Sequence, residues 1–483
     1  MITNTAKERR GNMAKGNSQP GEIKRVPLLI VLISGAFVAI LNQTLLATAF
    51  PHIMSDLHLD ANTVQWLQSI FMLVNGIMIP ITAFLIERFT TRRLFLFALG
   101  VFALGTLVCA LAPGFAFLMI GRVLQAAGAG IIMPLMQTIL FLIYPIEKRG
   151  AAMGLFGMVI AFAPAIGPTL SGWLVEHFSW RSLFYIILPI AIIDVLLAYL
   201  ILRNVTKQTF PKVDVLSIAL STLGFGGLLY GFSVAGSGGW LHWEVLIAFA
   251  VGSLTLVWFI LRQLKLEKPI LEFRIFQNKT FTLTTALGMV VFIAMIGGAV
   301  ILPIFMQNML GFTALESGLM LLPGAVVMGL MNPITGRIFD KFGAKWLVIS
   351  GLAIVTVTTF MFTNLTPATT FAYLATVNAV RMLGVAMVMM PSTTAGLNQL
   401  PTHLLPHGTA MNNTMRQVAG AVGTALLVSI MTNQAIPEEG VEGAIHGVNM
   451  SFLVATIMAA LGLFMAFFLK TAREDAKTRA KGV

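Results

Sequence analysis

The chain has 483 residues, of which 57% are hydrophobic and only 10% are charged, and its mean hydropathy is +0.88. Soluble domains carry about 25% charged residues, so the composition excludes an ordinary soluble protein and indicates a polytopic membrane protein. The formal net charge of +12 could suggest a nucleic-acid partner, but the place of the basic residues along the chain decides that question.

Fourteen apolar stretches are each long enough to cross a bilayer as a helix, which takes about 20 residues. We therefore predict an all-α polytopic membrane protein with fourteen transmembrane helices. In chain order the predicted spans are 28–50, 64–86, 94–112, 115–142, 151–174, 182–202, 214–235, 243–263, 281–309, 314–337, 346–364, 370–396, 408–432 and 449–470. The polar ends at 1–27 and 471–483 are predicted to be cytosolic tails, and the first has no apolar core of a signal peptide.

The basic residues follow these spans in a one-sided way. If both termini are cytoplasmic, nearly all of the 31 Lys and Arg fall in the tails or inner loops, and the exceptions are Arg122, Arg181, Arg381 and Arg416. Acidic residues gather instead near the outer ends of several spans. This is the positive-inside rule, so the excess positive charge predicts orientation in a membrane and no nucleic-acid partner.

The first span carries three consecutive polar residues, Asn42, Gln43 and Thr44. Two interpretations stay open for them: hydrogen bonds between helices, or the lining of a central cavity. With later polar residues they give the candidates for a substrate cavity, which are Asn42, Gln43, Gln125 and Gln307.

Two inner loops carry a similar charge pattern. The loop after the second span reads AFLIERFTTRR at 83–93, and the loop after the tenth reads GRIFDKFGAK at 336–345. An acid at a helix end followed by cations can hold two bundles together in one conformation and release them in another. One copy alone would be ordinary loop charge, but two copies favour an inner-face gate. Its candidate residues are Glu87, Arg88, Arg92, Gly336, Asp340 and Lys341.

The fourth span contains a fixed cation, Arg122, within the stretch RVLQAAGAGIIMP. Arg stays charged, and a charge at mid-membrane costs roughly 2.5–3.5 kcal/mol on insertion scales, which predicts a polar pathway nearby. In the fifth span, prolines remove helix donors and glycines let a neighbouring backbone approach closely. These residues are Pro164, Gly167, Pro168 and Gly172.

Of the 19 acidic residues, only Asp194 lies well within a span, at about the middle of the sixth. A carboxylate that alternates between a buried environment and a nearby cation suits proton coupling, whereas a static pair with an Arg is the competing interpretation. Glu316, at the outer start of the tenth span, is the second proton-coupling candidate. An acid at that position also simply matches the helix dipole.

The chain repeats itself. Arg381 in the twelfth span begins RMLGVAMVMMP, which echoes the stretch at Arg122, and the two charged loops repeat at a similar offset. Spans 9–14 are therefore predicted to repeat spans 1–6, with spans 7 and 8 inserted between two six-helix bundles. The predicted parts are an N-terminal bundle at 28–205, two linker helices at 206–280 and a C-terminal bundle at 281–470.

Several of these motifs resemble those of the major facilitator superfamily. Arg122-x-x-Gln125-x-x-Gly128 resembles its fourth-helix motif, and Ala163-Pro164-x-x-Gly167-Pro168-x-x-x-Gly172 resembles the fifth-helix motif of its antiporter branch. The two charged loops resemble the superfamily pattern G-x-L-a-D-r-x-G-r-k. The fourteen spans make the chain similar to the fourteen-helix drug:proton antiporter branch, and most similar to bacterial lincomycin-type and multidrug exporters.

The resemblance implies a proton-coupled antiporter of hydrophobic or amphiphilic drugs, working by alternating access as a monomer in the cell membrane of a bacterium. It implies no cofactor, because the proton gradient supplies the energy. One departure concerns the first helix, where the branch carries an acid in a pattern like L-D-x-T-x-x-x-x-A-x-P and this chain has Asn42. An amide cannot take up a proton, so the usual first-helix proton carrier is missing.

Other functions stay open or are disfavoured. The alternatives are a sodium or potassium/proton antiporter and an exporter of a lipid-like metabolite. An intramembrane enzyme or a receptor is disfavoured, since the sequence has no clustered nucleophile and base, no His/Cys metal cluster and no large signalling segment. The absence of a G-x-x-x-x-G-K-[ST] loop argues against ATP as the energy source. His403 and His407, in an inner loop, are expected to be surface polar residues.

Overall fold

The computed structural model describes residues 25–206 and 208–470. In these ranges fourteen helices are long and apolar enough to cross a membrane, which confirms the predicted all-α fold. They are α2 (Arg25–Leu45), α4 (Ala61–Arg88), α5 (Thr91–Ala110), α6 (Phe115–Ile143), α7 (Arg149–His177), α8 (Ser182–Ile201), α9 (Val215–Gly238), α10 (Trp243–Lys265), α11 (Lys279–Asn308), α12 (Ala314–Phe342), α13 (Lys345–Met361), α14 (Phe371–Leu397), α15 (Leu405–Asn433) and α16 (Gly440–Ala466). The predicted tails lie outside the described residues at 1–24 and 471–483.

Several helix boundaries differ from the predicted spans by a few residues, and two of the differences have a clear physical cause. The first span was expected to reach residue 50, but α2 ends at Leu45 and a short helix, α3 (Phe50–Leu57), follows with Pro51 in its first turn. Proline suits a helix start, so it begins a new helix instead of extending the old one. The last helix starts at Gly440, before the predicted 449, because hydropathy detects the apolar part of a helix and not its polar extension.

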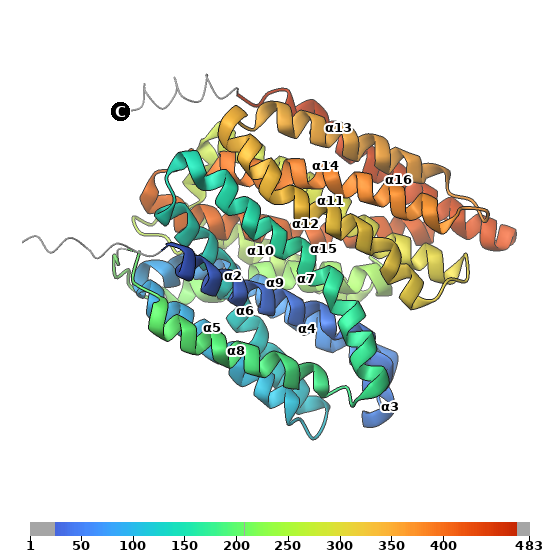
Figure 1. The fold of residues 1–483 in the computed structure, drawn as a ribbon, viewed down its shortest axis with the longest axis horizontal. Helices are drawn as coiled ribbons and strands as arrows, with labels where there is room; N and C mark the ends of the chain where they lie inside the picture. The colour runs from blue at the N-terminus through green and yellow to red at the C-terminus, as the bar shows by residue number, and fades with distance from the viewer. Residues whose placement is uncertain (1–24, 207, 471–483) are drawn as a thin grey trace, which may run out of the picture.

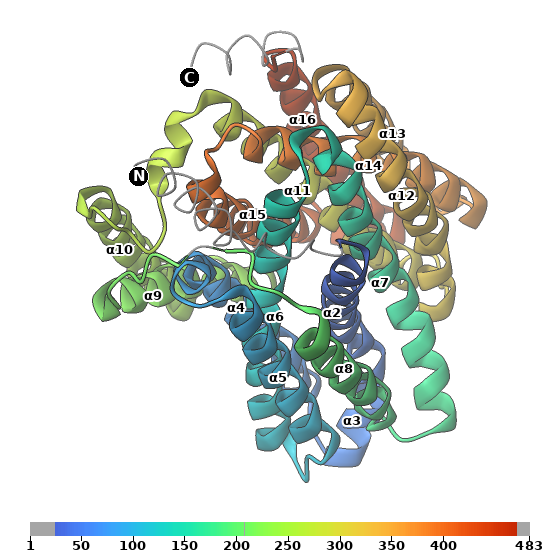
Figure 2. The same ribbon diagram turned by 60° about the vertical axis from the view of Figure 1, so that its left-hand side comes forward.

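The helices group into two bundles (Figure 1). The N-terminal bundle comprises α2 and α4–α8, and the C-terminal bundle comprises α11–α16. The inserted helices α9 and α10 pack on each other, and α9 also packs against α4 and α15, so the pair lies beside both bundles (Figure 2). The exact part boundaries at 205/206 and 280/281 stay predictions.

Both bundles run between the same two ends. Helix α2 begins, and helix α16 ends, at the same end of the molecule (Figure 1). We call it the inner end, after the predicted orientation. The starts of α7 and α15 and the ends of α4, α6 and α12 also lie there. Among the described residues, the hydrogen bonds that join the two bundles lie at this inner end and towards the middle of the molecule.

Candidate functional site

Asp340 links the two bundles at the inner end. It lies near the end of α12, and its carboxylate accepts hydrogen bonds from the backbone N–H groups of Gly150 (2.7 Å) and Ala151 (2.8 Å). These donors belong to the first turn of α7, where N–H groups have no partner within the helix and the dipole favours a negative charge. Asp340 therefore caps a helix of the opposite bundle.

Small residues allow this approach. A Cβ at Gly150 would overlap the carbonyl oxygen of Gly336, and a Cβ at Gly336 would overlap the carbonyl oxygen of Gly150. One turn further along, a Cβ at Gly154 would lie 2.5 Å from the carbonyl oxygen of Asn332. The backbones of α7 and α12 thus touch directly, and Gly336, one of the candidate gate residues, lies in this contact.

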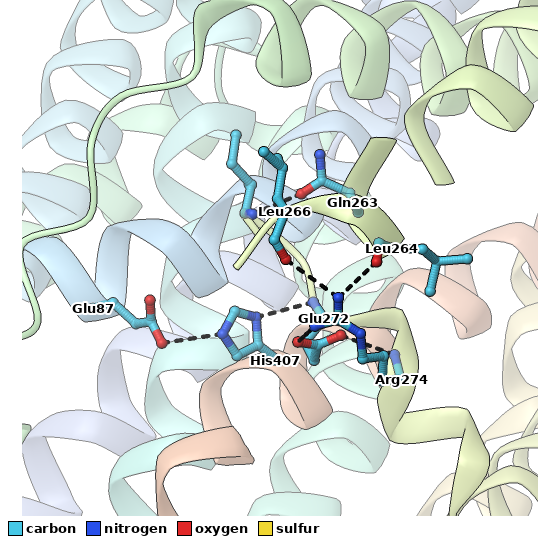
Figure 3. Close-up of polar contacts among 8 residues, drawn as sticks. Glu87, Gln263, Leu264, Leu266, Glu272, Arg274 and His407 are labelled. Atoms are coloured by element: carbon cyan, nitrogen blue, oxygen red, sulfur yellow. Dashed lines mark hydrogen bonds and ion pairs between the residues drawn. The ribbon is translucent and has the colours of Figure 1, made fainter. Parts of the chain in front are cut away.

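Glu87 makes a second link through a histidine (Figure 3). Glu87 Oε1 lies 3.1 Å from His407 Nε2, and His407 Nδ1 lies 3.3 Å from the backbone nitrogen of Glu272. A backbone N–H can only donate, so Nδ1 accepts and Nε2 carries the hydrogen that is donated to Glu87. The contact connects the end of α4 with the start of α15 as a neutral imidazole bonded to a carboxylate.

The same histidine holds the segment that follows the inserted helices (Figure 3). Glu272 forms an ion pair with Arg274 (3.2 Å), and Arg274 donates to the carbonyl oxygens of Leu264 (2.6 Å) and Leu266 (3.3 Å). His407 is only 4% exposed, so the expectation of a surface residue was wrong. The burial of His407 depends on its tertiary contact with Glu87, which a single sequence does not reveal.

The remaining gate candidates serve other contacts. Arg88 donates to the carbonyl oxygen of Pro211 (2.7 Å), and Arg92 donates to that of Tyr199 and stacks on its ring. Lys341 lies over the ring of its neighbour Phe342. These cations contact residues of their own bundle or of the connecting segment after it, whereas the acids Glu87 and Asp340 bond to the opposite bundle.

Further polar contacts join the bundles towards the middle of the molecule. Thr138 Oγ1 lies 2.7 Å from Thr409 Oγ1, and Asn413 donates to Gln137 Oε1 at 2.7 Å. Beyond that level, in the described residues, no hydrogen bond joins the N-terminal to the C-terminal bundle. The bundles are therefore bonded to each other along their inner halves only.

Arg122 is fully enclosed within the N-terminal bundle. Its guanidinium donates to the carbonyl oxygen of Leu67 (3.0 Å), to Gln125 Oε1 (3.1 Å) and to Gln68 Oε1 (3.4 Å), and it lies 4.3 Å from the ring centre of Phe71. Every guanidinium nitrogen thus reaches a neutral acceptor, and no carboxylate among the described residues pairs with the cation.

Gln125 extends this network to the first helix. Its Nε2 donates to Thr106 (3.0 Å) and to Asn42 Oδ1 (3.4 Å). The structure therefore brings Asn42, Gln125 and Arg122 together in one buried hydrogen-bond network. Gln43 is half-buried on α2 and Gln307 is exposed at the outer end of α11, and neither has a hydrogen bond to this network.

The C-terminal bundle buries two further cations. Arg381 donates to the carbonyl oxygen of Ala294 (3.0 Å) and to Asn378 Oδ1 (2.9 Å). Arg416 donates to the carbonyl oxygen of Met389 (3.4 Å) and to Thr393 Oγ1. Among the described residues no carboxylate pairs with either Arg. The sequence analysis named Arg416 only as a basic residue outside the tails and inner loops, and it assigned Arg416 no role.

Asp194 lies apart from all three buried cations. It is 2% exposed on α8, and its Oδ2 accepts a hydrogen bond from Ser34 of α2 at 3.0 Å. Ser34 also lines a largely apolar pocket of about 460 Å³ between α2 and α7. The static pair of Asp194 with an Arg, which the sequence left open, is therefore not present in the described structure.

Glu316 caps a helix, and the fifth-helix motif contributes to helix packing. Glu316 forms a capping box with Thr313 at the start of α12, through contacts of 2.8 Å and 3.2 Å. In α7, a Cβ at Gly167 would overlap Thr44 of α2, whereas one at Gly172 would meet no atom within 4 Å. The helix continues through Pro164 and Pro168, and the motif packs closely on α2 at Gly167 but not at Gly172.

Known proteins resemble this chain over most of its length. Residues 32–424 match the Major Facilitator Superfamily. The chain is 57% identical to the uncharacterized MFS-type transporter YcnB of Bacillus subtilis over 92% of this chain and 95% of that protein. It is 42% identical to the lincomycin resistance protein LmrB of Bacillus subtilis, covering 94% of this chain and 98% of that protein. It is 31% identical to the multidrug export protein EmrB of Haemophilus influenzae, covering 84% and 80%.

A solved structure supports the fold independently. The human organic anion transporter MFSD10 (TETRAN) superimposes with a TM-score of 0.69 at 14% identity, covering 92% of this chain and 100% of that chain. The fourteen apolar helices and these relatives place the chain in a bacterial cell membrane as a multi-pass protein. The chain belongs to the Major Facilitator Superfamily, and it is a transporter and not an enzyme.

Proposed function

We propose that this transporter exports hydrophobic or amphiphilic drugs from the cell in exchange for protons, as a monomer and without a cofactor. The observation that carries the proposal is the one-sided bonding of the two bundles, in which Asp340 and Glu87 bind helix starts of the opposite bundle. The drug class is supported by relatives named for lincomycin resistance and multidrug export.

Alternating access follows from where these bonds lie. With the termini in the cytoplasm, bonds at the inner end close the route to the cytoplasm, and the missing bonds between the outer halves suit an outward-facing state. To take up drug from the inside, the transporter would break the bonds of Asp340 to α7 and of Glu87 to His407. Rigid rotation of one bundle against the other achieves this without unfolding either.

Asp194 is our proposed proton carrier. Its bond to Ser34 connects α8 with α2, and Asn42 lies eight residues further along α2, a rise of about 12 Å. A protonated Asp194 becomes a hydrogen-bond donor, so the bond to Ser34 changes with the protonation state. Because α2 also carries Asn42, a shift of α2 would reach the polar network around Arg122. Glu316 is the weaker candidate, since its carboxylate already caps α12.

Drug-driven proton movement in proteoliposomes tests the proposal. The wild type, Asp194→Asn and the control Asp214→Asn would be compared with a panel of amphiphilic drugs and with sodium and potassium. Asp214 is the N-cap of α9 and pairs with Arg262. Asparagine caps a helix as well as aspartate does, so Asp214→Asn is a control that removes a carboxylate from a capping position. We expect drug-driven proton flux in the wild type and the control, and loss of coupling in Asp194→Asn.

Each other outcome has a definite meaning. Equal proton flux in the wild type and Asp194→Asn would contradict Asp194 as the proton carrier. Proton flux driven by sodium or potassium but by no drug would replace the exporter with a cation/proton antiporter. Drug movement without proton movement would be consistent with drug export but would contradict its coupling to protons.

A further inference from the structure

A small polar space lies inside the C-terminal bundle where α11, α14 and α15 meet. Gly288 of α11 is buried, yet a Cβ added there would meet no atom within 4 Å. Most other buried glycines of the bundle, such as Gly297 and Gly298, have a side chain in the corresponding place. The space beside Gly288 is therefore a local gap in close packing.

The register of the helices places Arg416 at the level of this gap. Phe281 of α11 packs near Gly408 of α15, and Phe292 packs against Gly420. Gly288 lies four residues before Phe292 on α11, and Arg416 lies four residues before Gly420 on α15. The two helices run parallel, so Gly288 and Arg416 lie at the same level. The guanidinium of Arg416 bonds to α14 at Met389 and Thr393, so all three helices contribute at one height.

Polar atoms without partners gather at the same level. The Nε of Arg416, the Oγ1 of Thr285, the Oγ of Ser392 and the Oδ1 of Asn412 are buried and have no hydrogen-bond partner. Thr285 lies one turn before Gly288 on α11, and Asn412 lies one turn before Arg416 on α15. Buried polar groups are nearly always hydrogen-bonded, so several exceptions in one layer indicate a missing ligand.

We propose that this space binds one monovalent anionic group, either a halide ion or the carboxylate of an organic anion. The reason is a cationic donor that is still free: Arg416 is 5% exposed, its Nε has no hydrogen-bond partner among the described residues, and the open space at Gly288 lies at its level. Two free hydroxyl groups can donate to an anion, and the amide of Asn412 can turn its NH₂ towards it. Water could also satisfy the hydroxyl groups, but an anion would in addition form a charge-assisted hydrogen bond with the free N–H of Arg416.

The two other buried cations lack such a site. All three guanidinium nitrogens of Arg122 already donate to neutral acceptors. Arg381 fills the space beside Gly298, where an added Cβ would overlap its guanidinium. Only Arg416, of the three, combines a free donor with adjacent open space in the described structure.

Thermal unfolding of the purified full-length protein in detergent tests the site. Tm would be measured in rising sodium chloride, and in a parallel series with sodium acetate, with sodium methanesulfonate, which is neither a halide nor a carboxylate, keeping the ionic strength constant. The variant Gly288→Leu fills the space without changing charge, and Arg416→Gln removes the charge. Gly318→Leu is the matched control, because Gly318 also faces open space but lies on α12.

We expect a saturable rise of Tm with one of the two small anions in the wild type and in Gly318→Leu. The rise should be lost in Gly288→Leu, and in Arg416→Gln if that variant folds. Protection by chloride alone would identify an inorganic ion, and protection by acetate would identify a carboxylate group. An equal rise in Gly288→Leu, or no dependence on either anion in the wild type, would overturn the proposal. The readout is binding, so it does not depend on drug transport.

Discussion

Arg122 shows how a permanent charge is kept inside a bundle without an acid. A backbone carbonyl, two glutamine amides and an aromatic ring surround its guanidinium. Neutral acceptors compensate part of the desolvation of the cation, and the fixed geometry lets all three nitrogens bond at once. The sequence predicted a polar pathway near Arg122, which stays a prediction; the structure shows Gln125, from the same motif, bonded to Arg122.

Loss of Gln125 should therefore destabilise the N-terminal bundle. Gln125→Leu leaves Arg122 Nη1 without an acceptor and removes the bonds to Thr106 and Asn42, so we expect a loss of roughly 1–3 kcal/mol in unfolding free energy. Gln68→Leu is the control, because its bond is longer (3.4 Å) and only part-buried. Chemical denaturation in detergent would measure both, and an equal or larger loss for Gln68→Leu would contradict the account.

Asp56 gives a prediction about pH outside the membrane spans. It lies on α3, and hydrogen bonds from the side chains of Trp180 (3.0 Å) and Arg181 (2.9 Å) lower the pKa of its carboxyl group below the ordinary value of 3.8. A carboxyl group with a lowered folded-state pKa stabilises the fold above its unfolded pKa, and this contribution is lost as the pH falls through the folded value.

The wild type should therefore lose Tm below about pH 4 partly through Asp56. Asp56→Asn cannot titrate, so its difference in Tm from the wild type should be largest near neutral pH and shrink in acid. A Tm scan from neutral to acidic pH measures this. A difference that stays constant down to the lowest pH would show that the carboxylate charge is not responsible.

At the scale of elements, the contact between α7 and α12 combines direct backbone packing with a carboxylate cap. The sequence identified Gly336 and Asp340 on α12, because the charged loop repeats along the chain. It did not identify Gly150, since nothing in a single sequence tells which helix start of the other bundle receives the carboxylate. His407 was missed for the same reason, and its buried position depends on the tertiary contact with Glu87.

Asp340→Asn should weaken the closed inner end. An amide can accept one of the two N–H bonds but lacks the charge that matches the start of α7, so we expect a loss of about 1.5–3 kcal/mol in the closed state, or roughly tenfold to a hundredfold in its population. Accessibility of a cysteine introduced at Ala151 to a membrane-impermeant thiol reagent in inside-out vesicles, in a Cys109→Ala background, would report this opening.

A steric variant separates packing from charge. Gly150→Leu should open the inner end at least as much as Asp340→Asn, because its side chain would meet the backbone of Gly336. Gly172→Leu on the same helix is the matched control, since a Cβ there meets no atom within 4 Å. Full export activity in Gly150→Leu would contradict a role of this contact in the transport cycle.

At the scale of the whole molecule, the sequence predicted the fourteen helices, the two bundles and the inserted pair. Apolar length and internal repetition determine these features, and both are visible in one chain. The conformational state was not predictable, because the same helices can pack at either end with similar energies. The partner of Asp194 was not predictable either: an ion pair with an Arg was one possibility, and the structure shows Ser34 of α2.

The central claim is that two carboxylate contacts at the inner end hold the outer halves apart. Cys109 is the only cysteine in the chain, so Cys109→Ala gives a background free of thiols. Spin labels at Gly172→Cys on α7 and Gly318→Cys on α12 would then report the outer separation by double electron–electron resonance. Both positions face open space in the structure, so the labels should not disturb packing.

The most direct test compares this distance with and without the two contacts. In the protein with Glu87 and Asp340 intact, we predict a long separation between the labels. Adding Glu87→Gln and Asp340→Asn together should shift the distribution to shorter distances, as the inner end opens and the outer halves close. A distribution that stays the same after both substitutions would contradict the account.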